Sequence, residues 1–562
     1  MDKKVKQRLY SKGVEEDLRA QGINPVLARL LASRGIASND DVDLSLPRML
    51  PVSTLTNATK MGELLADALR DQKKIVVSCD FDVDGCCAGA VMVRSLRAMG
   101  GNVDFAMPDR AVHGYGVSKL LVDEIHAKHH PDIILTVDCG ISSHAGIDRA
   151  NELGIRVLVT DHHIPGDTLP NAECIVNPNQ PNCSFASKNL AGVGVAFYTM
   201  LALRQEMRAR NAFTRPEPNL AELLDIVALA TIADVVKLDR NNRILVHQGL
   251  KRIREGKGSC GVRALYEATG KNPAEASVFD FGFILGPRIN AAGRLEDASF
   301  GVQCLISDDY NQALSIAKRL DAINRERREI ESEMKDAAEI ALEEIDVAGR
   351  YSLALFDKDW HQGVIGILSS RIKDKYGLPT ITFAPGADER FKGSGRSIPG
   401  LHLRDALDLV DKRNPGVLVA FGGHAMAAGM TVSAGKLEQF TAAFEAVCRD
   451  LLRPEDLMQI VETDGEIGND EISFETIDAI NGAIWGQGFP APLFEAEFEV
   501  LQQRLMKDKH IKLSLRKDGE IFEGIWFFHA DVLPDTVRLI YSLSVNEFRG
   551  TRSIQMVIQG VA

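Results

Sequence analysis

The chain lacks several features that would place it in a common class of protein. Its 562 residues contain no run of about 18 apolar residues, so no transmembrane helix is expected. The first residues, MDKKVKQRLYSKGVEED, have charge but no apolar core, which argues against a secretory signal. The nine cysteines form no CxxC pair, so neither a disulfide framework nor a zinc ribbon is predicted. A cytoplasmic protein is the simplest expectation.

The chain also has fewer basic than acidic residues. The net charge is −13, from 65 lysines and arginines against 78 aspartates and glutamates. Such a chain is not an obvious nucleic-acid binder by total charge. DNA affinity depends on a local basic surface, however, and a cluster of aspartates adds negative charge that bound cations offset. Acidity alone therefore leaves a nucleic-acid enzyme open.

The chain is too long for one hydrophobic core, and its pattern predicts several domains. After a helical extension, short apolar strands alternate with helices, which predicts an α/β domain with a doubly wound parallel sheet. A long connecting helix is expected next, because Ser307 to Ile345 contain neither Gly nor Pro. A second α/β domain and about five short strands follow, and the strands predict an OB-like β-barrel. The expected boundaries are 1–50, 51–300, 301–347, 348–452 and 453–562.

Two glycine-rich segments are interpreted as turns. GPRINAAGRL (Gly286 to Leu295) and the stretch from Val417 to Ala434 each contain several glycines. Glycine is common in turns because it adopts positive φ without steric cost.

Acidic residues follow three of the predicted strands. Asp80, Asp82 and Asp84 alternate in DFDVDG, directly after the strand at Ile75. An EF-hand loop begins with the same pattern, but it needs a glutamate at its twelfth position, which is Val91 here. Three carboxylates this close repel one another unless a cation lies among them. The segment therefore favours a catalytic metal site.

The other two acidic positions strengthen that interpretation. Asp138 follows the strand 133–137, and Asp161, His162 and His163 follow the strand 157–160. A single aspartate after a strand is commonplace as a turn or helix cap. Three such positions at the carboxyl edge of one parallel sheet lie where ligands bind in these folds. Aspartate and histidine together suit Mn²⁺ or Mg²⁺, and could also accept zinc or iron.

A pair of divalent cations predicts phosphodiester chemistry. Two such ions activate a water nucleophile and stabilise the leaving oxygen. Neither a GxSxG motif nor a P-loop lysine motif is present to suggest a different hydrolase.

Successive motifs resemble those of the DHH phosphoesterase superfamily. They are DFDVDG, HGYG (His113 to Gly116), DCG (Asp138 to Gly140) and DHH (Asp161 to His163). Later segments resemble the RecJ family of bacterial single-strand-specific DNA exonucleases: ATIADVV, GPRINAAGRL, GSGRSIPG, GGHAMAAG and PLFEAEFEVLQQRL. The resemblance implies a DHH-type catalytic domain, a long helix, a DHHA1-type substrate-binding domain and an OB-like domain.

The resemblance also implies roles for particular residues. Metal ligands would be Asp82, Asp84, Asp138, His162 and Asp234, with Asp80 and His163 binding metal or lying directly behind the ligands. Substrate contacts would come from Arg110, His163, Arg288, Asn290 and Arg294, and in the second α/β domain from Ser394, Arg396, Ser397 and His424. Glycines beside these residues let backbone N–H groups approach phosphate oxygens.

The last domain offers a basic stretch for DNA. It contains Arg504, Lys507, Lys509, Lys512 and Arg516. The aromatic residues Trp526, Phe527 and Phe528 follow, and basic groups near aromatic rings suit single-strand binding. The alternative is that these rings fill the barrel core, which we expect for at least one of them.

The resemblance implies a 5′-to-3′ exonuclease of DNA repair and recombination that releases 5′-mononucleotides. It uses two Mn²⁺ or Mg²⁺ ions, and a single-strand-binding protein and a repair helicase are possible partners of a monomer. A phosphodiesterase for oligonucleotides or cyclic dinucleotides, and a non-catalytic single-strand-binding protein, remain as alternatives. Asp109, His113 and Cys86-Cys87 depart from the expected pattern, which leaves rate and metal preference open.

Overall fold

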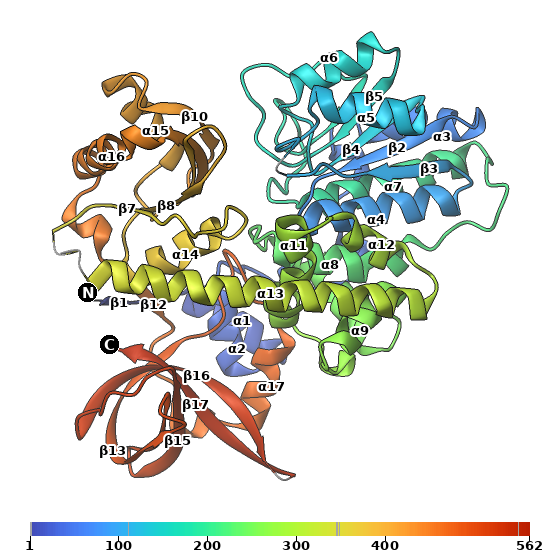
Figure 1. The fold of residues 1–562 in the computed structure, drawn as a ribbon. Helices are drawn as coiled ribbons and strands as arrows, with labels where there is room; N and C mark the ends of the chain where they lie inside the picture. Colours follow the sequence, from blue (N-terminus) through green and yellow to red (C-terminus); the bar gives the residue numbers. More distant parts are fainter. Residues whose placement is uncertain (1–2, 111, 344–346, 348, 549) are drawn as a thin grey trace. The chain divides into compact units, whose positions relative to one another are not determined.

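The computed structural model describes residues 3–110, 112–343, 347, 349–548 and 550–562 (Figure 1). The chain forms two compact units. Unit A contains residues 36–325 and 482–491, and unit B contains residues 1–35, 326–481 and 492–562. No helix in the described ranges is long and apolar enough to span a membrane.

Unit A contains a five-stranded parallel sheet with the order β3-β2-β4-β5-β6. Its strands are β2 (Lys74–Cys79), β3 (Asn102–Ala106), β4 (Ile133–Val137), β5 (Arg156–Thr160) and β6 (Cys174–Val176). The central strands are almost wholly apolar and buried, as expected when both faces of a parallel sheet are covered. The strand order reverses between β2 and β4, and this switch point is where such sheets bind ligands.

Helices cover both faces of this sheet. One face packs against α3 (Ala58–Arg70), α4 (Val83–Ala98) and α7 (Gly192–Ala209). The other face packs against α5 (Lys119–His129) and α6 (His144–Glu152), where Val76 and Ile134 meet Leu121 and Ile147. The doubly wound parallel sheet is therefore confirmed.

The rest of unit A is mostly helical. It comprises α8 (Leu224–Ala233), α9 (Arg240–Arg254), α10 (Cys260–Ala268), a π-helix (Asp280–Leu285), α11 (Gly286–Leu295) and α12 (Ser299–Ile306). The interpretation of GPRINAAGRL as a turn is wrong, because this segment is α11. Its glycines serve close packing: a Cβ on Gly293 would lie 2.3 Å from the carbonyl oxygen of Phe81.

The predicted long helix is confirmed as α13 (Tyr310–Glu343). Its first part, to residue 325, belongs to unit A, and the remainder belongs to unit B. Ion pairs one turn apart, including Lys335 with Glu339 at 3.6 Å, add modest support along its surface. The expected range of this helix was 301–347, but residues 301–306 belong to α12, and residues 344–346 lie outside the described residues.

Unit B contains a mixed sheet with the order β10-β11-β9-β8-β7. Its elements are β7 (Leu353–Phe356), α14 (Ile365–Tyr376), β8 (Thr380–Pro385), β9 (Arg390–Arg396), α15 (Leu403–Arg413), β10 (Leu418–Gly423), β11 (Ala427–Ser433) and α16 (Leu437–Leu451). The segment from Val417 to Ala434 was expected to form turns, and that expectation is wrong: it forms the hairpin β10–β11. Its neighbour β9 also carries glycines for packing, since a Cβ on Gly393 would lie 2.4 Å from the ring of Phe383.

The N-terminal segment of unit B was expected to be helical, but it is only partly so. It begins with β1 (Lys3–Gln7), which pairs in parallel with β12 (Gln459–Thr463), before α1 (Lys12–Ala20) and α2 (Pro25–Ala32). Arg34 after α2 binds both carboxylate oxygens of the buried Asp464 at 2.8 and 2.9 Å. This bidentate pair fixes the N-terminal segment to the chain after β12.

A closed five-stranded barrel ends the chain, as predicted. It follows α17 (Phe474–Gly482) and comprises β13 (Phe494–Met506), β14 (His510–Lys517), β15 (Glu520–Phe527), β16 (Thr536–Phe548) and β17 (Thr551–Val561). Its core contains the buried rings of Phe494, Phe498 and Tyr541.

The contact at Gly293 yields a test of the packing. Gly293→Ala should destabilise unit A by about 1–3 kcal/mol, because the new methyl group meets backbone that cannot move freely. Helix propensity alone would predict stabilisation by about 1 kcal/mol. Gly282→Ala is the matched control, because its Cβ would meet only Ile232 at 3.6 Å. Urea unfolding measures both variants, and equal stabilities would contradict the packing described here.

Candidate metal centre

The loop after β2 places three carboxylates at the switch point. Asp82 caps the N-terminus of α4, and its side chain accepts the N–H groups of Asp84 (2.9 Å) and Gly85 (3.1 Å). A Cβ on Gly85 would lie 2.4 Å from the carbonyl oxygen of Asp80, so only glycine permits this tight turn. The DG pair of the motif therefore serves the backbone as well as the chemistry.

Asp84 is fully buried and joins two helices. Its carboxylate oxygens accept the N–H groups of Gly192 (2.6 Å) and Val193 (2.9 Å) at the start of α7. The same side chain lies 3.9 Å from Nε2 of His162. A carboxylate oxygen has two lone-pair directions, so these hydrogen bonds leave capacity for a cation.

Asp138 directly follows β4 in a left-handed conformation, with φ of 59°. Such a backbone is uncommon outside glycine, although Asp and Asn tolerate it best. It places Oδ1 of Asp138 3.1 Å from Nε2 of His162. Gly192 makes room for the side chain, because a Cβ there would lie 2.5 Å from the same oxygen.

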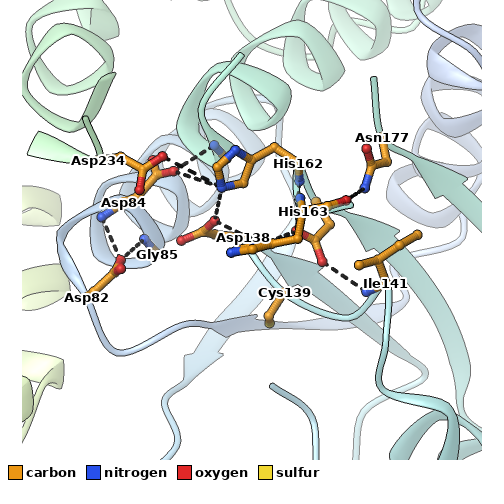
Figure 2. Close-up of polar contacts among 12 residues, drawn as sticks. Asp82, Asp84, Gly85, Asp138, Cys139, Ile141, His162, His163, Asn177 and Asp234 are labelled. Carbon is orange, nitrogen blue, oxygen red and sulfur yellow. Dashed lines mark hydrogen bonds and ion pairs between the residues drawn. The ribbon is translucent and has the colours of Figure 1, made fainter. Parts of the chain in front are cut away.

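Asp161 holds the two histidines in place. Its Oδ1 accepts the N–H groups of His162 (2.7 Å) and His163 (3.0 Å) and lies 2.8 Å from Nδ1 of His163, while Oδ2 accepts the N–H of Ile141 at 2.9 Å. Figure 2 shows the side chains of His162 and His163 beside Asp138. Burial alone would raise the pKa of Asp161, but these contacts hold it below its usual value. Asp161 is therefore an ionised positioning residue.

Further polar groups complete the support of the histidines. Asn177 and Asn179, just after β6, donate to the carbonyl oxygens of His163 (2.9 Å) and His162 (2.6 Å). The hydroxyl of Tyr115 lies 3.1 Å from the ring of His163. Sequence reasoning assigned no role to these residues, although Tyr115 lies in the HGYG segment and the two asparagines follow a strand at the carboxyl edge of the sheet, which were usable signals.

Asp234 reaches the same centre from the C-terminus of α8. Its Oδ2 lies 3.7 Å from Nε2 of His162. The next residue, Val235, has φ of 61°, which is strained for a β-branched side chain. Local strain of this kind persists only where the surroundings enforce it, and it is frequent at functional sites.

The side chains fall into three overlapping groups whose ligand atoms lie within 4.8 Å of one another. They are Asp80 with Asp82 and Asp138, Asp84 with His162 and Asp234, and Asp138 with His162 and His163. The third group shares members with each of the others. Buried Oδ1 of Asp80 and Oδ2 of Asp234 accept no hydrogen bond from any described residue. These residues fit two neighbouring cations that prefer oxygen ligands.

The electrostatics of the centre also favour the binding of cations. Burial and the neighbouring carboxylates raise the pKa values of Asp80, Asp138 and Asp234 well above the usual range. Burial and Asp82 raise the pKa of Asp84 to about 7. Without positive charge, the folded protein must therefore hold protons among these groups or tolerate their repulsion.

The residues of unit A that were expected to bind substrate have different surroundings in the structure. The guanidinium of Arg110 lies over the ring of Phe81 at 5.0 Å, and burial lowers its pKa. Asn290 accepts the N–H of Val83 at 2.9 Å, so it braces the loop that carries Asp82. Arg288 pairs with Asp321 at 2.9 Å, and Arg294 lies in the last turn of α11. Roles in substrate binding stay predictions for these residues.

The expected substrate residues of unit B surround β9 and the β10–β11 hairpin. Arg396 donates to Ser394 Oγ at 3.3 Å, and both side chains lie beside Gly366 at the start of α14. The buried hydroxyl of Ser397 donates to the carbonyl oxygen of Leu401 at 2.8 Å. His424 lies in the hairpin loop and donates its N–H to Ala427 at 2.8 Å. Ser397 therefore shapes the loop, and contacts with phosphate stay predictions.

The basic stretch of the barrel is partly neutralised. Lys512 pairs with Glu523 at 2.8 Å, and Arg516 pairs with Glu499 at 3.2 Å. Lys507 and Lys509 lie in the exposed β13–β14 turn, and Arg504 lies opposite Lys512 across the two strands. Arg504, Lys507 and Lys509 form no ion pair with a described carboxylate, so they are the better candidates for phosphate contacts.

The expectation that an aromatic residue of the 526–528 segment fills the barrel core is wrong. Trp526 is only half-buried and stacks on His529 at 3.7 Å. Phe527 and Phe528 are exposed. The barrel core contains other rings, and Phe527 and Phe528 lie on the outside of the barrel beside His510.

The departures from the expected pattern have structural explanations. His113 Nδ1 accepts the N–H of Asp109 at 2.8 Å, and Nε2 lies 3.1 Å from Glu124, so the pair organises its own loop. Cys86 and Cys87 are fully buried on α4, and burial raises the pKa of both thiols. The two cysteines therefore pack the core as neutral groups.

Comparison with known proteins identifies the family. Family models match three successive parts of the chain: the DHH family N-terminal domain (residues 74–231), the DHHA1 domain (348–450) and the RecJ OB domain (463–560). The chain is 46% identical over 560 residues to the single-stranded-DNA-specific exonuclease RecJ of Escherichia coli (strain K12), a match that covers 97% of each chain. The chain belongs to the RecJ family.

Solved structures of RecJ proteins share the fold. The structure of RecJ from Thermus thermophilus in complex with Mn²⁺ matches with a TM-score of 0.84 and 29% identity over 100% of this chain and 79% of that one. The Mg²⁺ complex of the same protein matches with a TM-score of 0.78 and 28% identity over 99% and 78% of the respective chains.

The raised pKa values predict a pH dependence that metal should remove. In chelator, the folded state binds more protons than the unfolded state, whose aspartates titrate near pH 4, so the free energy of unfolding should fall as pH rises from about 5 to 8. With saturating Mn²⁺ the site is held deprotonated in the folded state, so this fall should largely disappear. The stabilisation that Mn²⁺ adds over chelator should grow as pH rises through the same window.

Urea unfolding at several pH values, in chelator and in Mn²⁺, measures both slopes. Asp138→Asn should flatten the chelated slope and lose most of the stabilisation by Mn²⁺. Asp148→Asn, on the exposed side of α6, is the control. The same pH slope with and without metal would contradict a cation site here.

Proposed function

We propose that the chain is a metal-dependent exonuclease specific for single-stranded DNA. The observation that carries the proposal is the pair of acidic groups at the switch point of the parallel sheet, linked through Asp138 and His162. The names of the RecJ relatives describe the same activity, and the match to them covers nearly the whole chain.

We assign the ligands from these groups. Asp80, Asp82 and Asp138 would hold one cation, and Asp84, His162 and Asp234 would hold the other, with Mn²⁺ or Mg²⁺ as the ions. When bound, such a pair activates a water nucleophile and stabilises the leaving oxygen of a phosphodiester. Asp82, Asp84, Asp138, His162 and His163 are the catalytic residues in this proposal.

The chain's own side chains orient the substrate around this centre. Contacts of His163 with Asp161 and other carboxylates raise its pKa, although burial opposes this, so a charged ring is available to a phosphate oxygen. Burial raises the pKa of Tyr115, which stays a neutral hydrogen-bond donor beside His163. Arg110 and Arg294 supply further cationic groups in the same unit, and Arg288 adds one whose charge Asp321 partly neutralises, which suits a polyanion.

The OB barrel favours a polymer substrate over a dinucleotide. Its exposed Phe527 and Phe528 and its basic turn resemble the stacking and cationic surfaces that bind single strands elsewhere. A phosphodiesterase for dinucleotides needs no such domain. The non-catalytic alternative is less suitable, because buried carboxylates without metal would weaken DNA binding.

The finer parts of the proposal come from the resemblance to the family. They are 5′-to-3′ polarity, release of 5′-mononucleotides, a role in DNA repair and recombination, and a cytoplasmic location. A single-strand-binding protein and a repair helicase are the proposed partners of a monomeric enzyme. The predicted domain boundaries at residues 50, 300, 347 and 452 also belong to the proposal.

Asp138→Asn tests the catalytic centre. Asparagine tolerates the left-handed backbone at this position, so the variant should fold while losing a carboxylate that belongs to two of the three groups. We expect hydrolysis of single strands to fall by roughly 10³-fold or more, since several kcal/mol of transition-state stabilisation is lost. Affinity for DNA should change little. Hydrolysis within tenfold of wild type, measured with end-labelled DNA, would refute the assignment.

Substrate length separates the two enzymatic alternatives. Long single strands should be degraded far faster than a dinucleotide or a blunt duplex in Mn²⁺ or Mg²⁺. Activity confined to dinucleotides would favour the small-substrate phosphodiesterase. Complete absence of hydrolysis by folded, metal-loaded protein would favour the binding protein.

The barrel should contribute affinity rather than chemistry. Replacing Lys507, Lys509 and Lys512 with glutamine should raise KM on long strands and reduce the slope of log affinity against log salt. The slope should change by about 0.7 for each phosphate that a removed lysine had neutralised, and by less for Lys512 because Glu523 already pairs with it. Turnover on very short strands should stay close to wild type, and an equal loss of turnover on short and long substrates would contradict this division.

A further inference from the structure

A cavity of about 650 Å³ lies in unit A at the end of α4 opposite to the metal centre. Asp84 is in the first turn of α4 and Ser95 is in its last part, so roughly 17 Å of helix separates the two sites at 1.5 Å per residue. Residues from α4, α9, the start of α10 and the loops near Pro218 and Ile306 line the cavity. Its volume is in the range of small-molecule sites.

Two cationic side chains in this cavity make no ion pair with a described carboxylate. Arg97 donates to the carbonyl oxygen of Val103 through Nε (3.2 Å) and one terminal nitrogen (3.0 Å). Arg252 donates one terminal nitrogen to the carbonyl oxygen of Lys257 at 3.3 Å. These contacts fix both guanidinium groups and leave further N–H groups for a ligand.

Most other charges of the cavity are already paired, and the exception is the carboxylate of Glu222, which accepts the side-chain N–H of Asn219 at 3.4 Å. Arg94 pairs with Asp308 at 2.7 Å, and Lys257 pairs with Glu255 at 2.8 Å. At the start of α10, Asp225 accepts the N–H of Ser259 at 2.6 Å, so that helix end adds little positive potential. Arg97 and Arg252 are the groups left for an anion.

Arginines in the last turns of helices also interact favourably with the helix dipole, so their position alone does not indicate a ligand. Buried donors without partners supply the second observation. Ser95 is 1% exposed and lines the cavity, yet its hydroxyl has no hydrogen-bond partner among the described residues. Nε of Arg252 is also buried without a partner. Unpaired buried polar groups are costly, and both residues line this one cavity.

We propose that this cavity binds the phosphate group of a nucleotide-sized ligand. Arg97, Arg252 and the Ser95 hydroxyl donate to the phosphate oxygens, because a planar guanidinium group can donate two parallel hydrogen bonds to two oxygens of one phosphate. Pro218, Leu220 and Leu223 give the same cavity an apolar wall, which suits a sugar or base. A 5′-mononucleotide has both parts. The site lies outside the proposed catalytic centre and needs no metal.

Calorimetric titration of the full-length protein with 2′-deoxyadenosine 5′-monophosphate, in excess chelator, tests the proposal. Chelation keeps the metal centre from holding phosphate, so the result is independent of the nuclease activity. We expect one bound nucleotide, with Kd at least tenfold weaker for Arg97→Gln and Arg252→Gln. Lys271→Gln, an exposed cation outside the cavity, should bind as wild type does.

Two further arms identify the ligand chemistry. If inorganic phosphate binds as tightly as the nucleotide, and the same variants lose this binding, the site is a phosphate site whose ligand is the free ion. Deoxyadenosine that binds as tightly as its monophosphate overturns the proposal, as does a non-phosphorylated acidic peptide that displaces the nucleotide. Unchanged affinity in both arginine variants also overturns it.

Ser95→Ala gives an independent readout. It should weaken nucleotide binding severalfold while the melting temperature of the free protein stays equal or rises, because the unpaired buried hydroxyl is removed. A clear fall in melting temperature without ligand would show that the hydroxyl already has a partner, and would remove the basis of the site.

Discussion

Mutual repulsion among buried carboxylates is the constraint on which the rest of unit A depends. Asp80, Asp84 and Asp138 are buried and Asp234 is partly buried at one edge of the sheet, and the pKa values of all four are raised by desolvation and by neighbouring carboxylates. Such a cluster is stable in an apolar setting only when positive charge lies among its members. Cation binding and folding are therefore thermodynamically linked in this unit.

The surrounding structure holds the carboxylates together against that repulsion. Backbone N–H groups at the starts of α4 and α7 bind Asp82 and Asp84, and glycines at positions 85 and 192 allow the close approach. Asp161 acts differently, since its oxygens are used to position backbone and His163. The DHH motif thus combines one orienting carboxylate with two imidazoles that face the centre, as Figure 2 shows.

Sequence reasoning found the elements whose local pattern matches their environment. Asp82 and Asp138 were predictable because parallel strand ends converge at one edge, whereas Asp234 came only from family resemblance, since an aspartate ending an apolar helix resembles an ordinary cap. Gly293 was misassigned because glycine marks close packing as well as turns. The strand β1 was missed because its partner, β12, is remote in sequence. The local sequence around Asp234, Gly293 and β1 does not contain the information that decides these cases.

The pairing of β1 with β12 has a consequence for biosynthesis. Arg8 and Asp464, which also join these segments, are 456 residues apart in the chain. At ribosomal rates the N-terminal strand waits on the order of tens of seconds for its partner, while residues 36–325 are already complete. During that interval the segment must remain unpaired without aggregating. Its lysine-rich strand, KKVKQ, is suited to this, because charged side chains discourage pairing with other nascent chains.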